Sequence, residues 1–428
     1  MLDNFRHVHF IGVGGSGISA LAHLAKAHGL KVTGSDVANN PTILQLKNEG
    51  VEVFLSHNAE NLGELVEWVI YSEAIDKENN PEYLEAKKRG LQLTSYFEAL
   101  GLLSTHKKTI VVTGTHGKTT TTAMLGQALI EAGLDPTVIV GARVPYFKDR
   151  NIHIGKSEWL VVEGCEYRRN FSTLQPFGMI VLNCEWEHVD YFKSEGDYIN
   201  AFQELVSKLP QEGFLIYNQT DSNCRRITSH TRAKQIPVNF LDTAEIKLRV
   251  AGDFNKLNAA HALSAAEQMG GAKYEILMSL SRFSGTSRRM EMKGEVQGVL
   301  VIDDYGHHPT EVKATLRALK EHYPDRRLIC VFQPHQYSRT YELLEDFKTA
   351  FADADLLLIP NIYEARDTDE DKMKISAESL ASEIPRAQWT ENFEKTLEIL
   401  MKEAQPNNLL VTMGAGDVYK VGEQFLEV

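Results

Sequence analysis

The sequence predicts an α/β protein whose sheets are mainly parallel, and three observations support this prediction. Short apolar segments recur along the chain, and each is followed by a turn containing glycine and then by a helical pattern. The segments are continuously apolar, which is typical of strands buried on both faces of a parallel sheet. The stretches between them place apolar residues on one stripe at helical spacing. Strands that alternate with helices in this way define α/β layers.

Nine apolar segments are the predicted strands, and amphipathic stretches between them are the predicted helices. Two helices, Ser16–His28 and Thr119–Ala132, each follow a strand and a glycine-rich turn. The predicted strands are Val8–Val13, Thr109–Thr113, Trp159–Glu163, Met179–Asn183, Phe214–Asn218, Val299–Asp303, Arg327–Phe332, Asp355–Pro360 and Leu409–Met413.

The length of 428 residues predicts about three domains. A fresh strand and glycine loop follow the polar stretch 104–108, and a second change of pattern lies near Lys293 and Gly294. We therefore expect domains at 1–104, 105–293 and 294–428.

Composition excludes several classes of protein. The chain is 43% hydrophobic and 24% charged, which rules out a wholly disordered protein. A net charge of −13 repels a phosphate backbone, so we expect no nucleic-acid partner. The four cysteines form no CxxC pair, and no apolar run approaches the ~18 residues that span a bilayer. We expect no signal peptide, no membrane partner, a cytoplasmic location, and a monomer or homodimer.

Two glycine-rich loops each follow a predicted strand and open a predicted helix. In Gly114-Thr115-His116-Gly117-Lys118-Thr119, Lys118 would neutralise phosphate charge and Thr119 would place a hydroxyl on Mg²⁺. Val112 stands where the strict P-loop pattern has glycine, and a simple tight turn is the alternative. The loop Gly12–Gly17 fits GxGxxG with Asp36 further on, as for a nicotinamide, a flavin or another nucleotide, or for a packing turn.

Acidic residues and a histidine follow two strands of the middle region. Glu163 and Glu166 follow one strand, and Glu187 and His188 follow the next. Ligands of open parallel sheets lie outside the carboxyl ends of the strands. We therefore expect Glu163 and His188 to reach a metal ion beside the phosphates, with solvated loop charges as the alternative.

Other polar clusters have both a structural and a functional interpretation. Asn255 is either a helix N-cap or, with Asn258, a contact to adenine or to metal-bound water. Arg288 and Arg289 are either a surface pair or a phosphate clamp. Two histidine-containing stretches, 303–309 and 333–340, could hold a metal, but Arg339 suits a small carboxylate better.

Together these motifs resemble the Mur ligases, the ATP-dependent amino-acid ligases of peptidoglycan precursor synthesis. The resemblance runs from His9-Phe10-Ile11-Gly12 to Gly414-Ala415-Gly416-Asp417, and Phe332–Thr340 is its most specific stretch. It implies an N-terminal Rossmann-like UDP-binding domain, a central P-loop ATPase domain with a parallel sheet, and a C-terminal Rossmann-like domain.

The resemblance also implies the reaction, and it is strongest to the member that adds the first amino acid. The ATP γ-phosphate passes to the lactyl carboxylate of UDP-N-acetylmuramate, and the amine of L-alanine attacks the resulting acyl phosphate. The cofactors implied are ATP and Mg²⁺. Positioning and charge neutralisation supply most of the catalysis in such reactions.

Site residues are carried over position by position as implications of this resemblance. Lys118, Glu163 and His188 are the implied catalytic residues, and the implied Mg²⁺ ligands are Thr119, Glu163 and His188. The implied ATP site comprises Gly114, Thr115, His116, Gly117, Lys118, Thr119, Thr120, Asn255, Asn258, Arg289 and Asp304. The implied UDP-sugar site comprises Gly12, Gly14, Gly15, Ser16, Gly17, Ser35 and Asp36, and the implied amino-acid site Tyr305, His307, His335 and Arg339.

Several positions depart from the family pattern, and rival functions stay open. Gly164 and Cys165 stand where relatives often have Ala-Asp, Trp186 replaces a smaller residue, and Phe254 replaces a histidine. One rival is a Mur-type ligase for glycine, L-serine or a recycled tripeptide. The others are a nicotinamide-dependent oxidoreductase that uses Gly12–Gly17 and a catalytically silent nucleotide-binding protein.

Overall fold

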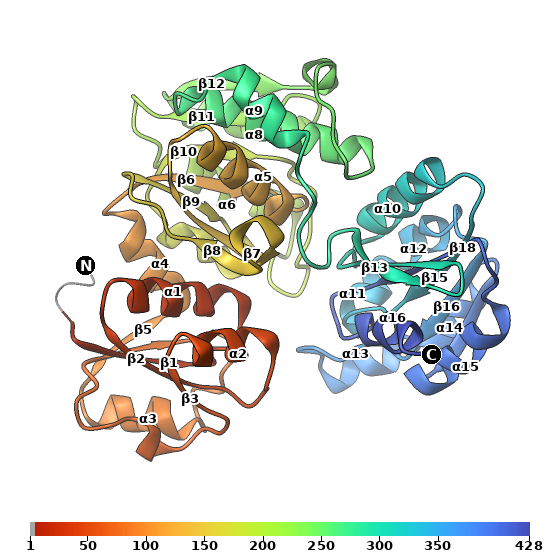
Figure 1. Cartoon of the computed structure of the whole chain (residues 1–428), viewed down its shortest axis with the longest axis horizontal. Helices are drawn as coiled ribbons and strands as arrows, with labels where there is room; N and C mark the ends of the chain where they lie inside the picture. The colour runs from red at the N-terminus through yellow and green to blue at the C-terminus, as the bar shows by residue number, and fades with distance from the viewer. Residues whose placement is uncertain (1–4) are drawn as a thin grey trace. The chain divides into compact units, whose positions relative to one another are not determined.

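The computed structural model describes residues 5–428 and contains three sheets, formed one after another along the chain (Figure 1). Strand pairs are parallel except for β7 with β8 and β13 with β14, among the residues described. The predicted α/β class is therefore confirmed.

The first sheet has the strand order β3-β2-β1-β4-β5 and is parallel throughout. The order reverses at β1, so the crevice beside the carboxyl end of β1 is where such a sheet binds a ligand. Its strands are β1 His7–Ile11, β2 Lys31–Ser35, β3 Glu52–Phe54, β4 Trp68–Tyr71 and β5 Gln92–Ser95. Its helices are α1 Ser16–Ala27, α2 Pro41–Asn48, α3 Pro81–Lys88 and α4 Tyr96–Ser104.

The second sheet has the order β12-β11-β10-β6-β9-β7-β8. Its first strand, β6, lies between β9 and β10, which brings three carboxyl ends together at one edge. The strands are β6 Lys108–Thr113, β7 Thr137–Val144, β8 Arg150–His153, β9 Trp159–Glu163, β10 Pro176–Val181, β11 Phe214–Asn218 and β12 Lys234–Val238. The helices are α5 Lys118–Glu131, α6 Glu195–Val206, α7 Ser222–Ile227, α8 Asp253–Gln268 and α9 Lys273–Leu280.

The third sheet has the order β13-β14-β18-β15-β16-β17. Its strands are β13 Glu291–Val296, β14 Val299–Asp304, β15 Arg327–Phe332, β16 Leu356–Pro360, β17 Ala387–Glu391 and β18 Asn408–Met413. Its helices are α10 Pro309–His322, α11 Tyr337–Glu342, α12 Leu344–Ala350, α13 Asp369–Lys374, α14 Ala377–Ser382, α15 Phe393–Glu403 and α16 Tyr419–Leu426.

Apolar side chains on both faces of the third sheet explain its continuously apolar strands. Cys330 and Phe332 belong to one buried cluster, whereas their neighbours Ile329 and Val331 belong to another. Because successive side chains of a strand point to opposite faces, both faces of this sheet are covered.

Helix starts differ in a way that bears on function. α2, α3, α4 and α6 begin at side-chain caps, which are Asn40, Asn80, Ser95 and Ser194. The N-cap residues of α1 and α5, by contrast, are Gly15 and Gly117, which have no side chain to cap the helix. Uncapped helix starts offer backbone N–H donors to an anion.

The chain divides into two compact units. The first holds the chain up to Trp186, Ser194–Ile246 and Asn258–Arg282, and so contains the first two sheets. The second holds Glu187–Lys193, Lys247–Leu257 and Phe283–Val428. β13 runs from Glu291 to Val296, so the boundary expected between 293 and 294 falls inside a strand.

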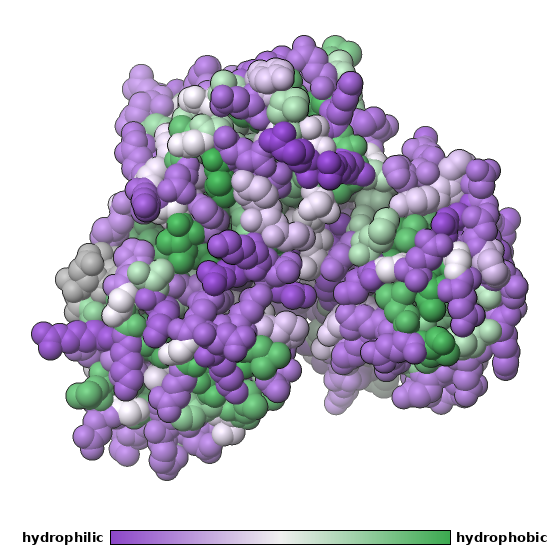
Figure 2. Space-filling model, in the orientation of Figure 1, coloured by the Kyte–Doolittle hydropathy of each residue, from purple (hydrophilic) through white to green (hydrophobic). Residues whose placement is uncertain are grey.

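The visible face in Figure 2 is largely hydrophilic, with hydrophobic residues in scattered groups. Within residues 5–428, no helix combines the length and the apolar character needed to cross a membrane.

Candidate active site

The loop between β6 and α5 has the backbone of a phosphate cradle. Gly114 and Gly117 have φ angles of 132° and 84°, a region that residues with a Cβ rarely adopt. A Cβ on Gly117 would also lie 2.6 Å from Asn258 Oδ1, so glycine is required there for two reasons. The same contact places the predicted Asn258 directly against the loop.

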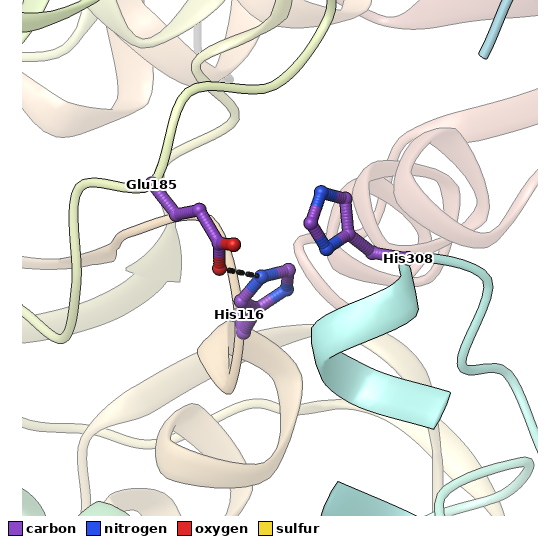
Figure 3. A group of neighbouring side chains, drawn as sticks. All are labelled: His116, Glu185 and His308. Atoms are coloured by element: carbon purple, nitrogen blue, oxygen red, sulfur yellow. Dashed lines mark hydrogen bonds and ion pairs between the residues drawn. The ribbon is translucent and has the colours of Figure 1, made fainter. Parts of the chain in front are cut away.

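Polar groups that follow β10 hold this loop in place. The backbone N–H of His116 donates to Asn183 Oδ1 at 2.8 Å, and the Asn183 amide donates to the His116 carbonyl at 3.1 Å. Thr115 donates its hydroxyl to the Glu185 carbonyl at 2.7 Å. His116 Nε2 lies 2.9 Å from Glu185 Oε2 (Figure 3). The side chains of Thr115 and His116 therefore anchor the loop.

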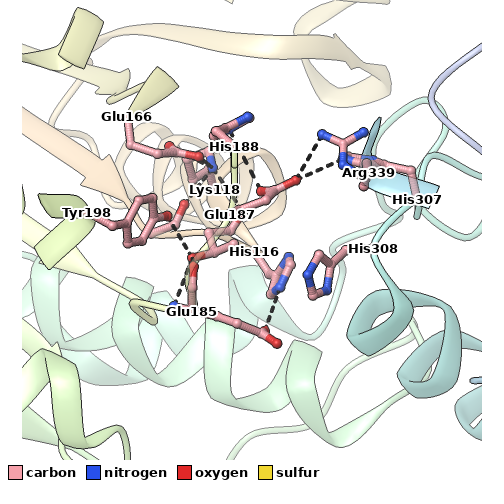
Figure 4. Close-up of polar contacts among 12 residues, drawn as sticks. His116, Lys118, Glu166, Glu185, Glu187, His188, Tyr198, His307, His308 and Arg339 are labelled. Atoms are coloured by element: carbon pink, nitrogen blue, oxygen red, sulfur yellow. Dashed lines mark hydrogen bonds and ion pairs between the residues drawn. The ribbon is translucent and has the colours of Figure 1, made fainter. Parts of the chain in front are cut away.

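Lys118 places its ammonium group within the loop. Its Nζ donates to the carbonyls of Gly114 and Thr115 and lies 3.1 Å from Glu166 Oε2 (Figure 4). The Glu166 side chain is only 2% exposed, so water screens this ion pair weakly. A cation held here can neutralise the charge of a bound phosphate. Glu166 was not among the predicted site residues, although its position just after a strand was a usable signal.

Glu163 and Thr119 present oxygen atoms side by side at the end of β9. Thr119 donates its hydroxyl to Glu163 Oε2 at 3.0 Å, and the backbone N–H of Gly141 donates to the other carboxylate oxygen. Carboxylate and hydroxyl oxygens are ligands that Mg²⁺ prefers. The donor set therefore fits the predicted role of these two residues.

His188 follows Glu187 in the short segment 187–193, which packs within the second compact unit. Its φ angle is 57°, an uncommon conformation for a residue with a Cβ. Glu163 belongs to the first unit, so the predicted metal pairing of Glu163 with His188 stays a prediction.

The residues predicted to bind the amino-acid substrate lie close together in the second unit. Arg339 Nη1 donates to the carbonyl of His335 at 3.3 Å and lies 3.2 Å from His335 Nδ1. The ring of His307 lies 6.2 Å from that of His335 and 5.7 Å from that of Tyr305. Burial and the nearby Arg339 charge lower the pKa of His335 to about 3, so this ring is neutral near pH 7.

Glu187 joins this cluster and was not predicted as a site residue. Its Oε1 accepts from Arg339 Nη2 at 3.2 Å and from His307 Nε2 at 3.3 Å (Figure 4). Burial alone would raise the pKa of Glu187, but the His307 hydrogen bond and the neighbouring His188 and Arg339 side chains hold it well below its usual range. Glu187 is therefore a buried carboxylate that stays ionised.

Arg288, Arg289 and Asp304 stiffen the start of the C-terminal region. Arg288 donates to Asp303 at 3.0 Å and to the carbonyls of Gly414 and Gly416, so it is a structural anchor. Arg289 lies over the Tyr305 ring at 5.0 Å.

Both carboxylate oxygens of Asp304 accept backbone N–H groups, from Met290 at 2.8 Å and from Gly306 at 2.7 Å. Burial raises the pKa of Asp304 to about 6. The ATP contacts expected of Arg289 and Asp304 stay predictions.

Asn255 is not a helix N-cap, because α8 already begins at Asp253. Its amide donates to the carbonyl of Ala251 at 2.7 Å. The adenine contact expected of Asn255 stays a prediction.

The N-terminal glycine loop is closed by the strand beside it. The backbone N–H groups of Gly12 and Val13 both donate to the Ser35 carbonyl, at 2.8 and 3.0 Å. The N–H of Gly14 donates to Asp36 Oδ2 at 2.8 Å. Asp36 thus occupies one of the loop's own amides, a contact that the sequence pattern did not predict.

A buried acid, Glu82, supports this loop through Ser35. Glu82 is fully buried, and it accepts from the Ser35 hydroxyl at 2.5 Å and from His57 Nδ1 at 2.9 Å. Burial raises the pKa of Glu82, but the His9 ring, whose Nε2 lies 3.7 Å from Oε1, and the hydrogen bond from Ser35 outweigh this and lower it overall. Ser35, expected to contact the UDP-sugar, therefore uses its hydroxyl and its carbonyl within the protein.

The departures from the family pattern have partial physical explanations. A Cβ on Gly164 would lie 2.6 Å from Val111 Cγ1, so glycine fits the packing here. Burial raises the pKa of Cys165 to about 12, which makes this thiol a poor nucleophile. Trp186 is 39% exposed.

Comparison with sequence models of protein families places three matches along the chain. Residues 7–108 match the "Mur ligase family, catalytic domain", residues 112–242 the "Mur ligase middle domain", and residues 288–416 the "Mur ligase, glutamate ligase domain".

Curated relatives match over nearly their whole length. A UDP-N-acetylmuramate–L-alanine ligase from Clostridium acetobutylicum is 38% identical over 99% of this chain and 98% of its own. One of the same name from Clostridium novyi is also 38% identical, with the same coverage.

Solved structures show the same fold. The UDP-N-acetylmuramate-alanine ligase MurC from Thermotoga maritima covers 98% of both chains, with a TM-score of 0.82 and 26% identity. A murein peptide ligase from Psychrobacter arcticus, at 23% identity and a TM-score of 0.75, shares the fold.

Fold and site together define a three-sheet α/β ligase with a P-loop-like phosphate cradle. More particularly, the chain belongs to the Mur ligase family.

Proposed function

We propose that the chain is the ATP-dependent ligase that joins L-alanine to the lactyl carboxylate of UDP-N-acetylmuramate in peptidoglycan precursor synthesis. The observation that carries this proposal is the full-length similarity to relatives named for that reaction, at 38% identity. Three sheets, a phosphate cradle and an arginine-centred cluster are the parts that such a reaction needs. A cytoplasmic location, a monomer or homodimer, and the absence of nucleic-acid and membrane partners go with this proposal.

The central loop is the proposed ATP site. Lys118 binds the terminal phosphates and stabilises charge as the γ-phosphate leaves for the lactyl carboxylate. Glu166, which now pairs with Lys118, keeps the lysine in the loop before nucleotide arrives. Gly114, Gly117 and the uncapped start of α5 supply backbone donors for the phosphates, and Thr120 lies in the first turn of this helix.

Thr119 and Glu163 are the proposed Mg²⁺ ligands of this site, together with His188. The 3.0 Å contact between Thr119 and Glu163 supports the pair, because it joins two oxygen donors of the kind that Mg²⁺ takes. When bound, the ion neutralises phosphate charge.

The N-terminal loop is the proposed UDP-sugar site. The uncapped start of α1 offers the N–H groups of Ser16 and Gly17 to a diphosphate, whereas the N–H of Gly15 donates to the Gly12 carbonyl at 3.2 Å. A nicotinamide-dependent oxidoreductase would use the same loop but leaves Lys118, Thr119 and Glu163 without a role. Absence of NADH binding in a fluorescence titration would eliminate that alternative.

The amine is the least constrained part of the proposal. One methylene or hydroxyl changes binding by only about 1–3 kcal/mol, so glycine and L-serine are close competitors. A recycled tripeptide is the other alternative within the family.

The test is phosphate release from ATP and Mg²⁺ with UDP-N-acetylmuramate and, in turn, L-alanine, glycine, L-serine or the L-Ala-γ-D-Glu-meso-diaminopimelate tripeptide. We expect release with L-alanine at the highest kcat/KM, and a product whose mass matches the amide. Preferred use of the tripeptide would move the chain to precursor recycling. No release with any amine would favour a silent nucleotide-binding protein.

A further inference from the structure

A buried carboxylate lies beside the guanidinium that is proposed to bind the amino acid's carboxylate. Glu187 Oε1 lies 3.2 Å from Arg339 Nη2, and their side chains are only 6% and 8% exposed (Figure 4). Binding of a substrate carboxylate by an arginine does not by itself require an acid beside the guanidinium. Glu187 is therefore a candidate for a role of its own.

The contacts of Glu187 are long for charged groups. Charge-assisted hydrogen bonds usually measure about 2.7–2.9 Å. Glu187 instead contacts Arg339 at 3.2 Å and His307 at 3.3 Å, both through one oxygen. Arg339 is held independently through Nη1, by the ring and the carbonyl of His335. The guanidinium is thus held by His335 through a different nitrogen atom from the one that contacts Glu187.

The charges of this pair match those of a free α-amino acid. An α-amino acid carries an ammonium and a carboxylate group on one carbon, so its two charges are only a few ångströms apart. Arg339 and Glu187 offer the opposite charges at a similar spacing. Both side chains are buried, so water screens their charges only weakly. A small carboxylate without an ammonium group would meet the Glu187 charge uncompensated, which disfavours it.

Glu187 reaches this position from a distant part of the chain. It is separated from Arg339 by 152 residues, yet the segment 187–193 packs with the unit that contains α11. We propose that Glu187 binds the α-ammonium group of the amino-acid substrate beside Arg339, and so selects zwitterionic amino acids over other small carboxylates. The inference rests on the proposed function and extends it.

The test compares L-alanine with propionate, which lacks only the amino group. In Glu187→Gln, the KM for L-alanine rises about 10- to 100-fold, the range expected for a lost hydrogen bond to a charged group. The inhibition constant of propionate, measured against L-alanine, falls about tenfold because the opposing charge is gone. Glu187→Asp keeps the charge, so it still binds L-alanine in preference to propionate, as the wild type does.

Each other pattern overturns the proposal. If both ligands bind more weakly, Glu187 only positions Arg339. If both bind more tightly, it merely competes with the substrate carboxylate. Unchanged constants would remove it from the site. Glu204→Gln is the matched control, because Glu204 pairs with Arg169 on an exposed surface, and both constants stay at wild-type values there.

Two further measurements keep the test decisive. If Glu187→Gln does not fold, wild-type protein still decides: L-alaninamide, which keeps the ammonium group, competes with L-alanine better than propionate does, and the reverse order overturns the proposal. Wild-type phosphate release with L-alanine is recorded first. If the wild type releases no phosphate with L-alanine, the proposed function is contradicted. If it releases phosphate normally, but the KM for L-alanine and the inhibition constant of propionate do not change in opposite directions in Glu187→Gln, only the Glu187 assignment is contradicted.

Discussion

Two glycine loops of this protein each follow the first strand of a sheet, yet their chemistry differs. The loop after β1 is closed by the end of β2, because Asp36 accepts the N–H of Gly14 and the Ser35 carbonyl accepts two more N–H groups. The loop after β6 instead encloses the ammonium group of Lys118. An acid, Asp36, lies beside the first loop, and a cation, Lys118, lies at the second.

The difference shows how one topology serves two tasks. An acid beside the loop suits a diphosphate group that takes no part in the reaction, since the acid fixes the backbone without neutralising phosphate. A lysine with Thr119 and Glu163 beside it suits a phosphate that is transferred, because charge develops there in the transition state. A buried glutamate also supports each loop: Glu82 accepts from Ser35 beside the first loop, and Glu166 pairs with Lys118 at the second.

The largest effect is expected at Lys118. Lys118→Met lowers kcat for L-alanine-dependent phosphate release by about a thousandfold, because the transferred charge loses its cation. The same change removes the cation beside the buried Glu166, which costs about 3–5 kcal/mol of unfolding free energy. Adding Glu166→Gln restores much of that stability in a denaturant titration but none of the activity. Lys234→Ala, at an exposed lysine, serves as the control. Activity retained in Lys118→Met would remove the contrast between the loops.

The next effect concerns the metal. Glu163→Gln raises the Mg²⁺ concentration needed for half-maximal rate by about 10- to 100-fold, since a charged oxygen ligand is lost. The KM for UDP-N-acetylmuramate changes little, because that ligand belongs to the other loop. Initial rates at varied Mg²⁺ give the first quantity, and initial rates at varied UDP-N-acetylmuramate give its KM. Glu212→Gln is the control. An unchanged magnesium dependence would assign Glu163 a purely structural role.

A smaller effect is expected at the acid of the N-terminal loop. Asp36→Ala frees the N–H of Gly14 and loosens the turn, so the KM for UDP-N-acetylmuramate rises about tenfold. The KM for ATP and kcat stay near wild type, as they do in the control Glu60→Ala. A change in ATP affinity instead would show that the loops do not divide the substrates in this way.

The smallest effect on activity is expected at Glu82, and its signature is pH dependence. The pKa of Glu82 is lower in the folded protein than in the unfolded chain, so its contribution to stability is present above its ordinary pKa of 4.5. That contribution is lost as the pH falls further, through the folded pKa. The stability difference between wild type and Glu82→Gln therefore shrinks as the pH is lowered from 7 towards 3, as urea titrations at each pH would record. A difference that is constant with pH would mean that the charge of Glu82 does not support the loop.

Much of the fold follows from local patterns, and the parts that do not are informative. All nine predicted strands correspond to strands of the structure within a few residues, because their apolar runs are buried on both faces. Short or polar strands such as β3, Glu52–Phe54, and β13, Glu291–Val296, were missed. Their partners in the sheet, more than their own composition, make them strands.

The candidate site divides in the same way. Lys118 and Thr119 open α5 as the motif predicted, because a strand–loop–helix unit fixes them locally. Glu163 reaches Thr119 through the pairing of β9 with β6. Glu166 and Glu187 acquire their importance from Lys118 and from the distant Arg339. A lone acid in a sequence is most often solvated, so only the folded chain identifies these two as buried partners of cations.

The most direct test of the account follows the oxygen atoms of the lactyl carboxylate. UDP-N-acetylmuramate labelled with ¹⁸O at this carboxylate is turned over with ATP, Mg²⁺ and L-alanine, and the released phosphate is analysed by mass spectrometry. Transfer of phosphate to the carboxylate followed by attack of the amine predicts one ¹⁸O atom in each phosphate released. Unlabelled phosphate would contradict the acyl-phosphate route, and with it the task assigned to the loop around Lys118.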